Sequence, residues 1–258
     1  MTIAERHQII VNKLKKEGFV SVANLSKEME VTTVTVRKDL KMLEERGLLF
    51  RSHGSATPVT PFVKDLPVNE KNLMQVEEKT EIAIMAAGMI KEGDAIIIGS
   101  GTTMLALARA IPKSIKLTVI TGAMNVTMVL MDYPNIEVIQ LGGVVRKSSY
   151  SVVGHYGEDM LGDFACNKLF LGVDGISPEY GLTTSNMLEA HLNAKMIKSA
   201  QKTIILTDSS KFGKKGFGKI CDIEMVDIVV TDDGVPEGYR KQLEETGMKV
   251  CIAKPATK

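Results

Sequence analysis

The feature that most constrains this chain is an alternation of short β-branched runs with amphipathic segments, which begins after Gly93. The apolar runs cover residues 95–99, 117–121, 136–141, 169–173, 203–207, 226–231 and 249–253. Amphipathic segments lie between many of them, at 102–110, 124–132, 186–200 and 236–246. This alternation predicts an α/β fold, with a mostly parallel sheet flanked by helices on both faces.

The first 57 residues show a different pattern, in which three amphipathic helices precede a short strand. Capping residues and apolar periodicity predict these elements over residues 3–17, 21–29, 33–46 and 48–52. Thr32 or Thr33 caps the third helix, Gly47 ends it, and His53-Gly54 makes a turn after the strand. Three helices with a short second connection and a small hairpin predict a winged helix-turn-helix domain.

A stretch containing several prolines separates the two patterns. Three of the chain's eight prolines lie within residues 56–68, which suits an extended connection. A helical pattern resumes near Asn69 and continues to Lys91, with a break near Gln75 as one interpretation. We therefore expect a winged helix-turn-helix domain, a linker and an α/β domain at residues 1–57, 58–72 and 73–258.

Charge and hydropathy narrow the classes of function. The net charge is only +1, but the first 57 residues hold ten Lys and Arg against seven Asp and Glu, a net +3, and the rest hold 22 against 24, a net −2. The excess positive charge therefore lies where a phosphate backbone would be attracted to it. The N-terminus lacks a signal-peptide pattern and the apolar runs are too short to cross a bilayer, so we expect a cytoplasmic protein without membrane contact.

The cysteines and histidines do not indicate a metal site or a disulfide. Cys166, Cys221 and Cys251 lie far apart, and the four histidines show no ligand spacing. Small buried side chains in a reducing compartment explain the cysteines better. We therefore expect no metal and no cofactor.

The third helix carries side chains suited to reading DNA. Its exposed face would present Thr33, Thr35, Arg37, Lys38 and Lys41. Short hydroxyl side chains enter the major groove closely, and arginine donates two hydrogen bonds to guanine or clamps a phosphate. On the wing, Arg51 and His53 are candidates for backbone or minor-groove contacts. A three-helix bundle with a solvated basic face explains the periodicity equally well.

A turn rich in glycine and hydroxyl groups follows the first strand of the second domain. Ser100-Gly101-Thr102-Thr103 comes after the run 95–99 and opens an expected helix. Glycine allows close backbone approach, the helix N-terminus offers free N–H groups, and the hydroxyls add donors, so the turn suits a phosphate group. The alternative is a tight strand-to-helix turn that binds nothing.

Polar residues also follow other expected strands. These candidates are Gly142, Gly143, Asp174 and Lys211. In open α/β sheets ligands bind outside the carboxyl ends of the strands, so Asp174 could accept hydrogen bonds from sugar hydroxyls and Lys211 could meet a negative group or a hydroxyl. Each alone is more often a structural turn residue, and their shared placement is the reason to group them.

Residues 6–56 resemble the N-terminal domain of the DeoR family of bacterial regulators. The matching positions are Arg6, Ile9, Leu14, Gly18, Val22, Leu25, Val31-Thr32, Thr35–Leu40, Leu43, Gly47, Leu49 and Arg51-Ser52-His53-Gly54. The family usually has Gly-Gly-Ala after its histidine, where this chain has Gly54-Ser55-Ala56. The resemblance implies binding to double-stranded operator DNA.

Residues 70–232 resemble the sensor domain of the same family. The matching stretches are Glu78-Lys79, Ile82-Ala83, Gly93-Asp94, Ser100–Thr103, Leu107-Ala108, Leu141–Gly143, Val153-Gly154, Phe170–Ile176, Gly181–Thr184 and Asp208–Gly213. This sensor fold is similar to ribose-5-phosphate isomerase, so the resemblance implies a phosphorylated sugar as effector and adds Thr184 to the candidate contacts. One departure is Thr121-Gly122-Ala123, where the family often has Thr-Asn-Ser, and Met124-Asn125 is a candidate replacement.

Two further residues on the expected helix 186–200 are open to interpretation. Glu189 and Lys195 are candidates to face the pocket, in the manner of the acid and base groups of the isomerases. A solvated helix face explains them at least as well.

Three hypotheses about function follow. The first is a transcription factor, a repressor of a sugar-catabolic operon, in which a phosphorylated sugar changes the spacing of two recognition helices in a homo-oligomer, a dimer or a tetramer. The second is a sugar-phosphate isomerase with a DNA-binding appendage, which would need a base from Asp174, Glu189 or Lys211. The third is an architectural DNA-binding protein with an inactive sensor. We favour the first, which requires no catalytic residue.

Overall fold

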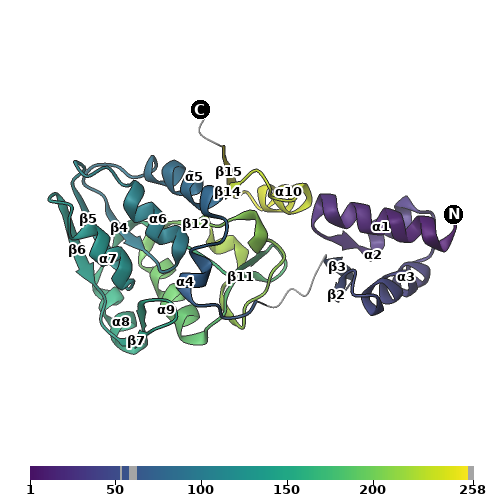
Figure 1. The fold of residues 1–258 in the computed structure, drawn as a ribbon, viewed down its shortest axis with the longest axis horizontal. Helices are drawn as coiled ribbons and strands as arrows, with labels where there is room; N and C mark the ends of the chain where they lie inside the picture. Colours follow the sequence, from purple (N-terminus) through teal and green to yellow (C-terminus); the bar gives the residue numbers. More distant parts are fainter. Residues whose placement is uncertain (53, 58–62, 255–258) are drawn as a thin grey trace.

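The computed structural model describes residues 1–52, 54–57 and 63–254. Within them the chain forms a small helical domain followed by a larger α/β domain, which confirms the expected fold class (Figure 1). The expected turn residue His53 and part of the expected linker, residues 58–62, lie outside the described residues. The division of the chain near residues 57 and 73 stays a prediction.

Three helices with hydroxyl N-caps build the N-terminal domain. They are α1, α2 and α3, over Ile3–Glu17, Val22–Glu28 and Thr33–Glu45. The side chains of Thr2, Ser21 and Thr32 accept hydrogen bonds from backbone N–H groups of the first turns. Thr32, rather than Thr33, is therefore the cap of the third helix. The core between the helices includes Ile10, Leu25 and Leu40.

A three-stranded antiparallel sheet completes this domain. Its strands β1, β3 and β2, in spatial order, cover Val20–Ser21, Ser55–Thr57 and Phe50–Ser52. The sequence predicted one strand over 48–52 and none before the second helix. β1 has only two residues, which are too few to show a periodicity in the sequence. It forms a strand because Val20 and Ser21 pair with Ala56 and Ser55 of β3.

A seven-stranded parallel sheet lies at the centre of the larger domain. Its order is β15-β14-β12-β9-β4-β5-β6, and every adjacent pair is parallel. In chain order from β4 the strands are Ala95–Ile98, Leu117–Thr121, Ile136–Gln140, Cys166–Leu171, Ala200–Leu206, Ile228–Asp232 and Lys249–Ala253. The strand order reverses beside β4, which lies between β5 and β9. Ligands bind at such reversal points in open α/β sheets.

Helices cover both faces of this sheet (Figure 1). α5, α6 and α7 pack on one face and α9 and α10 on the other, over Val76–Ala87, Thr102–Ala110, Met124–Leu130, Met187–Lys198 and Glu237–Glu245. Along β4, Ile97 joins the core on the α9 face, whereas Ile96 and Ile98 join the core on the opposite face. Burial on both faces explains why the strands are unbroken apolar runs in the sequence.

The expected helix over 69–91 is two helices in the structure. α4 covers Val68–Lys71 and α5 begins at Val76. Gln75 lies between them with a φ of 50°, in the left-handed region that interrupts a helix. The break near Gln75 is thus confirmed, whereas the expected end at Lys91 is too late, because Gly88 caps α5.

Two small antiparallel units and a short helix were not predicted. One unit is the sheet β10-β11-β13 over Gly175–Ser177, Gly181–Thr184 and Gly218–Cys221, and the other is the hairpin β7-β8 over Val144–Arg146 and Ser151–Val153. The helix α8 covers His155–Met160. Strands of three or four residues show no period in the sequence, yet β7 and β11 carry two residues of the pocket described below.

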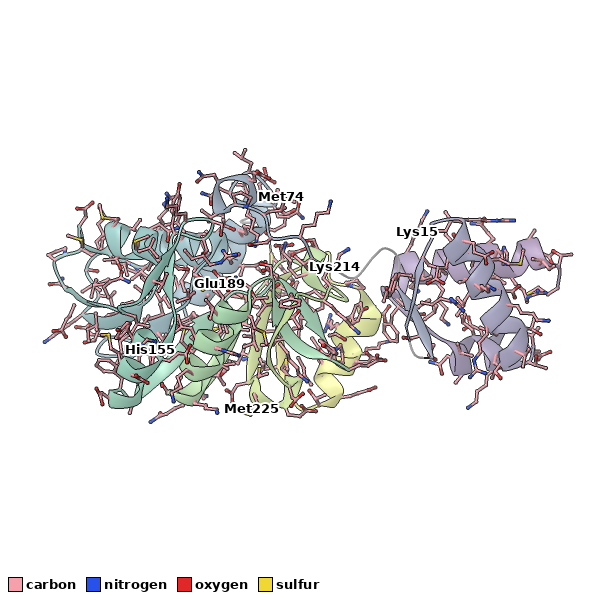
Figure 2. The ribbon with its side chains drawn as sticks, turned by 90° about the horizontal axis from the view of Figure 1, so that it is seen from below. Lys15, Met74, His155, Glu189, Lys214 and Met225 are labelled. Atoms are coloured by element: carbon pink, nitrogen blue, oxygen red, sulfur yellow. The ribbon has the colours of Figure 1, made fainter. Side chains whose placement is uncertain are left out.

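The two domains touch through α1 and α10 (Figure 1). Phe19, which follows α1, lies against Tyr239 of α10 with 5.1 Å between the ring centroids. Figure 2 shows the domains side by side, with Lys15 on the smaller one and Glu189 within the larger one. The orientation of the first domain is therefore supported by a side-chain contact as well as by the chain connection.

Candidate DNA-binding surface and effector pocket

Helix α3 presents most of the expected DNA-contacting side chains to solvent. Its exposed residues include Thr33, Arg37, Lys38 and Lys41. Thr35 is half-buried, and its hydroxyl lies 3.0 Å from that of the cap Thr32. Among the described residues, Arg37 and Lys38 have no ion-pair partner, and Lys41 has an exposed pair with Glu45 at 3.8 Å. These charges are available to an anionic partner.

Val34 is an exposed residue of this surface that the sequence reasoning did not select. Its side chain is 57% exposed in the first turn of α3. An aliphatic side chain at that position suits contact with a thymine methyl group. The signal was present in the sequence, since Val34 falls between two selected threonines and off the apolar face defined by Val36 and Leu40.

A buried ion pair holds α3 against α1. Arg6 donates from Nε to Asp39 Oδ2 at 2.6 Å and from Nη2 to Asp39 Oδ1 at 3.0 Å. His7 Nε2 lies 3.3 Å from the same carboxylate. Asp39 is 3% exposed, so it orients the helix rather than meeting DNA. Bidentate arginine–carboxylate pairs add geometric specificity, which fits a helix that must be held at a set angle.

Arg51 braces the strand β2 against α3. Its Nε donates to Glu44 Oε2 at 2.7 Å, and its backbone N–H donates to Oε1 at 2.9 Å. These two bonds, the backbone one first, lower the pKa of the Glu44 carboxyl. The Arg51 guanidinium is therefore shared with a carboxylate. His53 lies outside the described residues, and its contact with DNA stays a prediction.

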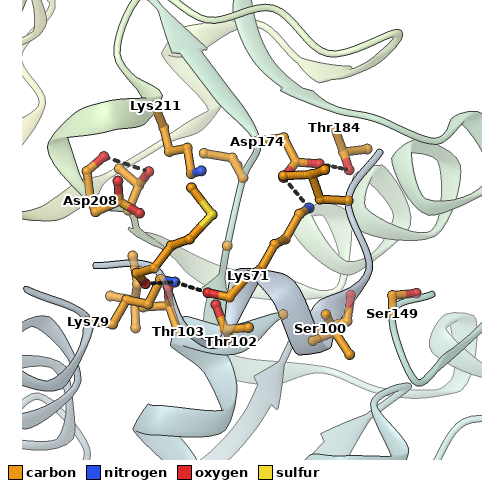
Figure 3. Close-up of a pocket in the computed structure, with 18 of the residues that line it drawn as sticks. Lys71, Lys79, Ser100, Thr102, Thr103, Ser149, Asp174, Thr184, Asp208 and Lys211 are labelled. Carbon is orange, nitrogen blue, oxygen red and sulfur yellow. Dashed lines mark hydrogen bonds and ion pairs between the residues drawn. The ribbon is translucent and has the colours of Figure 1, made fainter. Parts of the chain in front are cut away.

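A pocket opens at the carboxyl ends of β4, β9 and β12, where the strand order reverses (Figure 3). Its empty volume, which includes the open mouth, is about 860 Å³. Most of the expected effector-binding residues line it, namely Ser100, Gly101, Thr102, Thr103, Asp174, Thr184 and Lys211.

The structure does not bring Gly142 and Gly143 to this pocket. They follow β6, the edge strand, which β5 separates from β4. A Cβ atom at Gly143 would lie 2.6 Å from the carbonyl oxygen of Val153, so this glycine serves the approach of the β7-β8 hairpin. Asn125 does not line the pocket either. The departure at Thr121-Gly122-Ala123 therefore lies away from the candidate ligand contacts.

One end of the pocket combines the hydroxyl-rich turn with lysines. Gly101 has a φ of 113°, which a residue with a Cβ adopts only with strain, and α6 begins at Thr102. Lys211, at the end of the turn Ser209–Lys211, points into the middle of the pocket from the wall opposite Thr102 and Thr103 (Figure 3). A helix N-terminus, hydroxyl donors and an ammonium group converge here, which is the donor set that a phosphate requires.

Lys79 is a pocket residue that the motif search did not select. It is 8% exposed and donates to the carbonyl oxygens of Lys71 and Met74, at 2.6 and 2.5 Å, so it joins α5 to the end of α4. Burial lowers the pKa of Lys79, and the charges of Lys211 and Lys71 act in the same direction while Asp208 opposes them. The sequence held a signal for Lys79, because Lys79 lies three positions before the buried Ile82 and therefore on the same face of α5.

Asp174 lies at the other end of the pocket. Its Oδ1 accepts from Lys71 Nζ at 2.7 Å, and its Oδ2 accepts from Thr184 Oγ1 at 3.1 Å and from the backbone N–H of Ser185 at 3.0 Å. Burial alone would raise the pKa of this carboxyl. The charge and hydrogen bond of Lys71, the Ser185 amide and the charge of Lys211 outweigh burial and hold the pKa below its usual value. Asp174 is therefore an ionised acceptor.

Arg146 and Glu189 form a second charged pair in the pocket. Arg146 Nη1 lies 3.6 Å from Glu189 Oε1, and Arg146 Nη2 contacts Asp65. Glu189 is 8% exposed, and among the described residues its Oε1 has no hydrogen-bond donor. Glu189 thus faces the pocket, whereas Lys195 is exposed on α9 and does not line it. The solvated-face explanation fits Lys195 alone.

Neither a cluster of metal-binding side chains nor a membrane-spanning helix occurs in the part of the chain that the structure describes. No group of three or more His, Cys, Asp or Glu side chains there is arranged to hold a metal ion. Nor does any helix there combine the length and apolar character needed to cross a bilayer.

A winged helix-turn-helix joined to an α/β domain with a charged pocket is the architecture of a ligand-responsive transcriptional regulator. Residues 6–62 match the DeoR-like helix-turn-helix domain, and residues 74–233 match the DeoR C terminal sensor domain. The chain belongs to the DeoR family of DNA-binding transcriptional regulators.

Two relatives of comparable length support this assignment. The chain is 36% identical to the HTH-type transcriptional regulator YulB of Bacillus subtilis, over 97% of this chain and 96% of the relative. It is 30% identical to the glycerol-3-phosphate regulon repressor of Escherichia coli, over 95% and 97%. Among solved structures, ribose 5-phosphate isomerase A of Methanocaldococcus jannaschii is similar over 52% of this chain and 53% of that chain, at 17% identity and a TM-score of 0.38.

Proposed function

We propose that this protein represses a sugar-catabolic operon. A phosphorylated sugar, bound in the pocket of the sensor domain, modulates the affinity of the protein for operator DNA. The observation that carries the proposal is that Lys79 and Lys211 line the same pocket as the turn Ser100–Thr103. Asp174 and Glu189 at the other end supply acceptors for hydroxyl groups. A phosphate end and a hydroxyl end together match a phosphorylated sugar or polyol.

The relatives favour the same class of effector. One relative is named the glycerol-3-phosphate regulon repressor, and the compound in that name is a phosphorylated polyol. We infer that this chain acts in the cytoplasm as a homo-oligomer, a dimer or a tetramer, whose paired recognition helices meet the two halves of a palindromic operator.

We infer further that the pocket binds its ligand without converting it. Isomerisation needs a base that takes a proton from a sugar carbon, and a base is effective when its pKa lies near the working pH. The pKa of Asp174 is held below its usual value, and its Oδ1 already accepts from Lys71. These features suit a hydrogen-bond acceptor better than a base.

A thermal-shift screen tests the proposal. The panel contains ribose 5-phosphate, fructose 6-phosphate and glycerol 3-phosphate, with the unphosphorylated compounds and inorganic phosphate as references. At least one phosphorylated compound should raise Tm and change the affinity for DNA of the protein's own promoter region. Lys211→Met should weaken binding of that compound by roughly 10- to 150-fold, the equivalent of about 1.5–3 kcal/mol for a charged hydrogen bond.

The control is Lys195→Met, which removes an exposed lysine that does not line the pocket and should bind the compound as the wild type does. The proposal fails if no phosphorylated compound changes Tm or DNA affinity. Turnover of the bound compound in a coupled assay would instead favour the isomerase hypothesis.

A further inference from the structure

The segment 63–75, which follows the DNA-binding domain in the chain, forms one wall of the effector pocket. Asp65, Val68, Lys71 and Gln75 all line it. The segment is attached to the sensor domain by backbone hydrogen bonds, from Val63 N–H to the Lys215 carbonyl at 2.9 Å and from Val68 N–H to the Ser148 carbonyl at 2.7 Å. The connection between the two domains is therefore also a part of the ligand site.

Two ion pairs hold this segment to the residues that would recognise hydroxyl groups. Lys71 Nζ donates to Asp174 Oδ1 at 2.7 Å, and the side chains are 23% and 11% exposed (Figure 3). Asp65 accepts from Arg146 and, at 3.0 Å, from Ser185 Oγ. The Asp65–Arg146 pair is more open, because the Asp65 side chain is 42% exposed. A pair that is largely shielded from water, such as Lys71–Asp174, holds more firmly than a surface pair. Lys71 and Asp65 thus anchor the segment from inside the pocket.

Glu189 places an acceptor without a donor beside this cluster. Its buried Oε1 has no hydrogen-bond donor among the described residues, although a buried carboxylate oxygen normally has one. Arg146 Nη1 is 3.6 Å away, too far for a hydrogen bond. A ligand hydroxyl would supply the missing donor, and it would lie next to the two anchoring pairs.

A phosphorylated ligand would also compete directly for Lys71. A phosphate monoester carries a charge of roughly −1.5 to −2 at neutral pH, against −1 on Asp174. Lys71 extends across the pocket between the phosphate-binding turn and Asp174 (Figure 3). A dianion placed at Ser100–Thr103 attracts the ammonium away from Asp174, and a ligand hydroxyl can then take the freed carboxylate oxygen.

We propose that the segment 63–75 is the element that senses effector binding. The ligand displaces Lys71 from Asp174 and Asp65 from Arg146, and the segment is thereby released from the sensor domain. This inference rests on the proposed function, because it requires a phosphorylated ligand in the pocket. The segment connects the sensor domain to the DNA-binding domain, so its release lets the DNA-binding domain move. Ligand binding in the pocket is thereby coupled to the position of α3.

Hydrogen–deuterium exchange of the unmodified full-length protein tests this directly. The probe is whichever of ribose 5-phosphate, fructose 6-phosphate and glycerol 3-phosphate binds in the thermal-shift screen, at saturation. Amides within 63–75 should exchange at least several-fold faster with the ligand bound, although most ligands slow exchange near their sites. Slower or unchanged exchange in this segment, with the ligand bound, would overturn the inference.

Matched variants provide a second test. Lys71→Met and Asp65→Asn each remove one anchor, so exchange in 63–75 should already be fast without ligand and should rise little when ligand is added. Lys64→Met and Glu70→Gln alter exposed residues of the same segment and should behave as the wild type. The inference is wrong if the anchor variants exchange as slowly as their controls.

The outcomes separate this inference from the proposed function. If none of the three phosphates binds, the proposed function fails and the inference fails with it. If one binds and changes DNA affinity while the segment stays protected, the proposed function stands and only the release of the segment is refuted.

Discussion

At the scale of single residues, Asp174 shows how the pocket is kept in one protonation state. Three donors meet its two oxygens, and Lys71 supplies the opposite charge. Because the folded-state pKa is lowered, the folded protein binds fewer protons than the unfolded chain at mildly acidic pH. The stabilisation from Asp174 is therefore fully present above the unfolded value of about 3.8 and is lost as the pH falls through the lower folded value.

The stability difference between the wild type and Asp174→Asn should shrink with falling pH. The variant should have the lower Tm at pH 7, and the gap should narrow toward pH 3, because the unfolded wild-type chain takes up a proton there that the folded carboxylate binds only at lower pH. A difference of about 1 kcal/mol corresponds to roughly 2–4 °C in a protein of this size. Asp132→Asn, at an exposed position, should follow the wild type at every pH. A Tm difference between the wild type and Asp174→Asn that is constant with pH would contradict the lowered pKa of Asp174.

At the scale of elements, α3 is built to hold its polar face outward at a set angle. Asp39 joins it to α1, Glu44 joins it to the wing, and Val36 and Leu40 bury its apolar face. The first turns, which carry Thr33 and Arg37, stay free of such contacts. Helix-turn-helix proteins read base edges with the N-terminal residues of the recognition helix, and this arrangement leaves those residues available.

Arg37→Ala should weaken operator binding by about 1–3 kcal/mol if Arg37 contacts a guanine, and should relax sequence preference at one position. A phosphate contact would instead weaken binding to all sequences and reduce the salt dependence. Gel-shift titrations at two salt concentrations distinguish these cases. Arg109→Ala removes an exposed arginine from the sensor domain and should have no effect. Unchanged affinity of the Arg37 variant would remove this residue from the DNA-binding surface.

At the scale of the whole molecule, α10 lies between the DNA-binding domain and the turn that carries Lys211. Tyr239 is 4% exposed and packs between Phe19 and Phe212, with ring centroids 5.1 and 6.1 Å away. Gly213 has a φ of 73°, and a Cβ atom there would lie 2.3 Å from the Tyr239 hydroxyl. The turn that carries Lys211 is therefore packed directly beneath the helix that touches the first domain.

Phe19→Ala should loosen the contact between the domains. Burying a phenylalanine side chain contributes up to about 3 kcal/mol, and the aromatic pairing adds to this. Calorimetry should show the DNA-binding domain unfolding at a lower temperature than in the wild type, with the transition of the sensor domain little changed. Phe217→Ala is the matched control, because Phe217 is 82% exposed. Equal unfolding profiles for the two variants would show that the Phe19 contact is unimportant.

Local patterns in the chain were enough to predict the strands of the parallel sheet and most of the longer helices, and the resemblance to the DeoR family supplied the class of protein. All seven strands of the parallel sheet and the helices α1, α3, α6 and α9 follow from apolar periodicity and capping residues, which act over a few positions. The same patterns located Ser100–Thr103, Asp174 and Lys211, because polar residues after parallel strands gather at one edge.

The remaining pocket residues depend on contacts between distant parts of the chain. Lys71 meets Asp174 across 103 positions, and Asp65 meets Arg146 across 81. No local pattern encodes such pairs, since strand order and the return of the segment 63–75 onto the sheet set them. The same strand order excludes Gly142 and Gly143, which follow the edge strand β6. Folding thus converts an expected linker into a wall of the binding site.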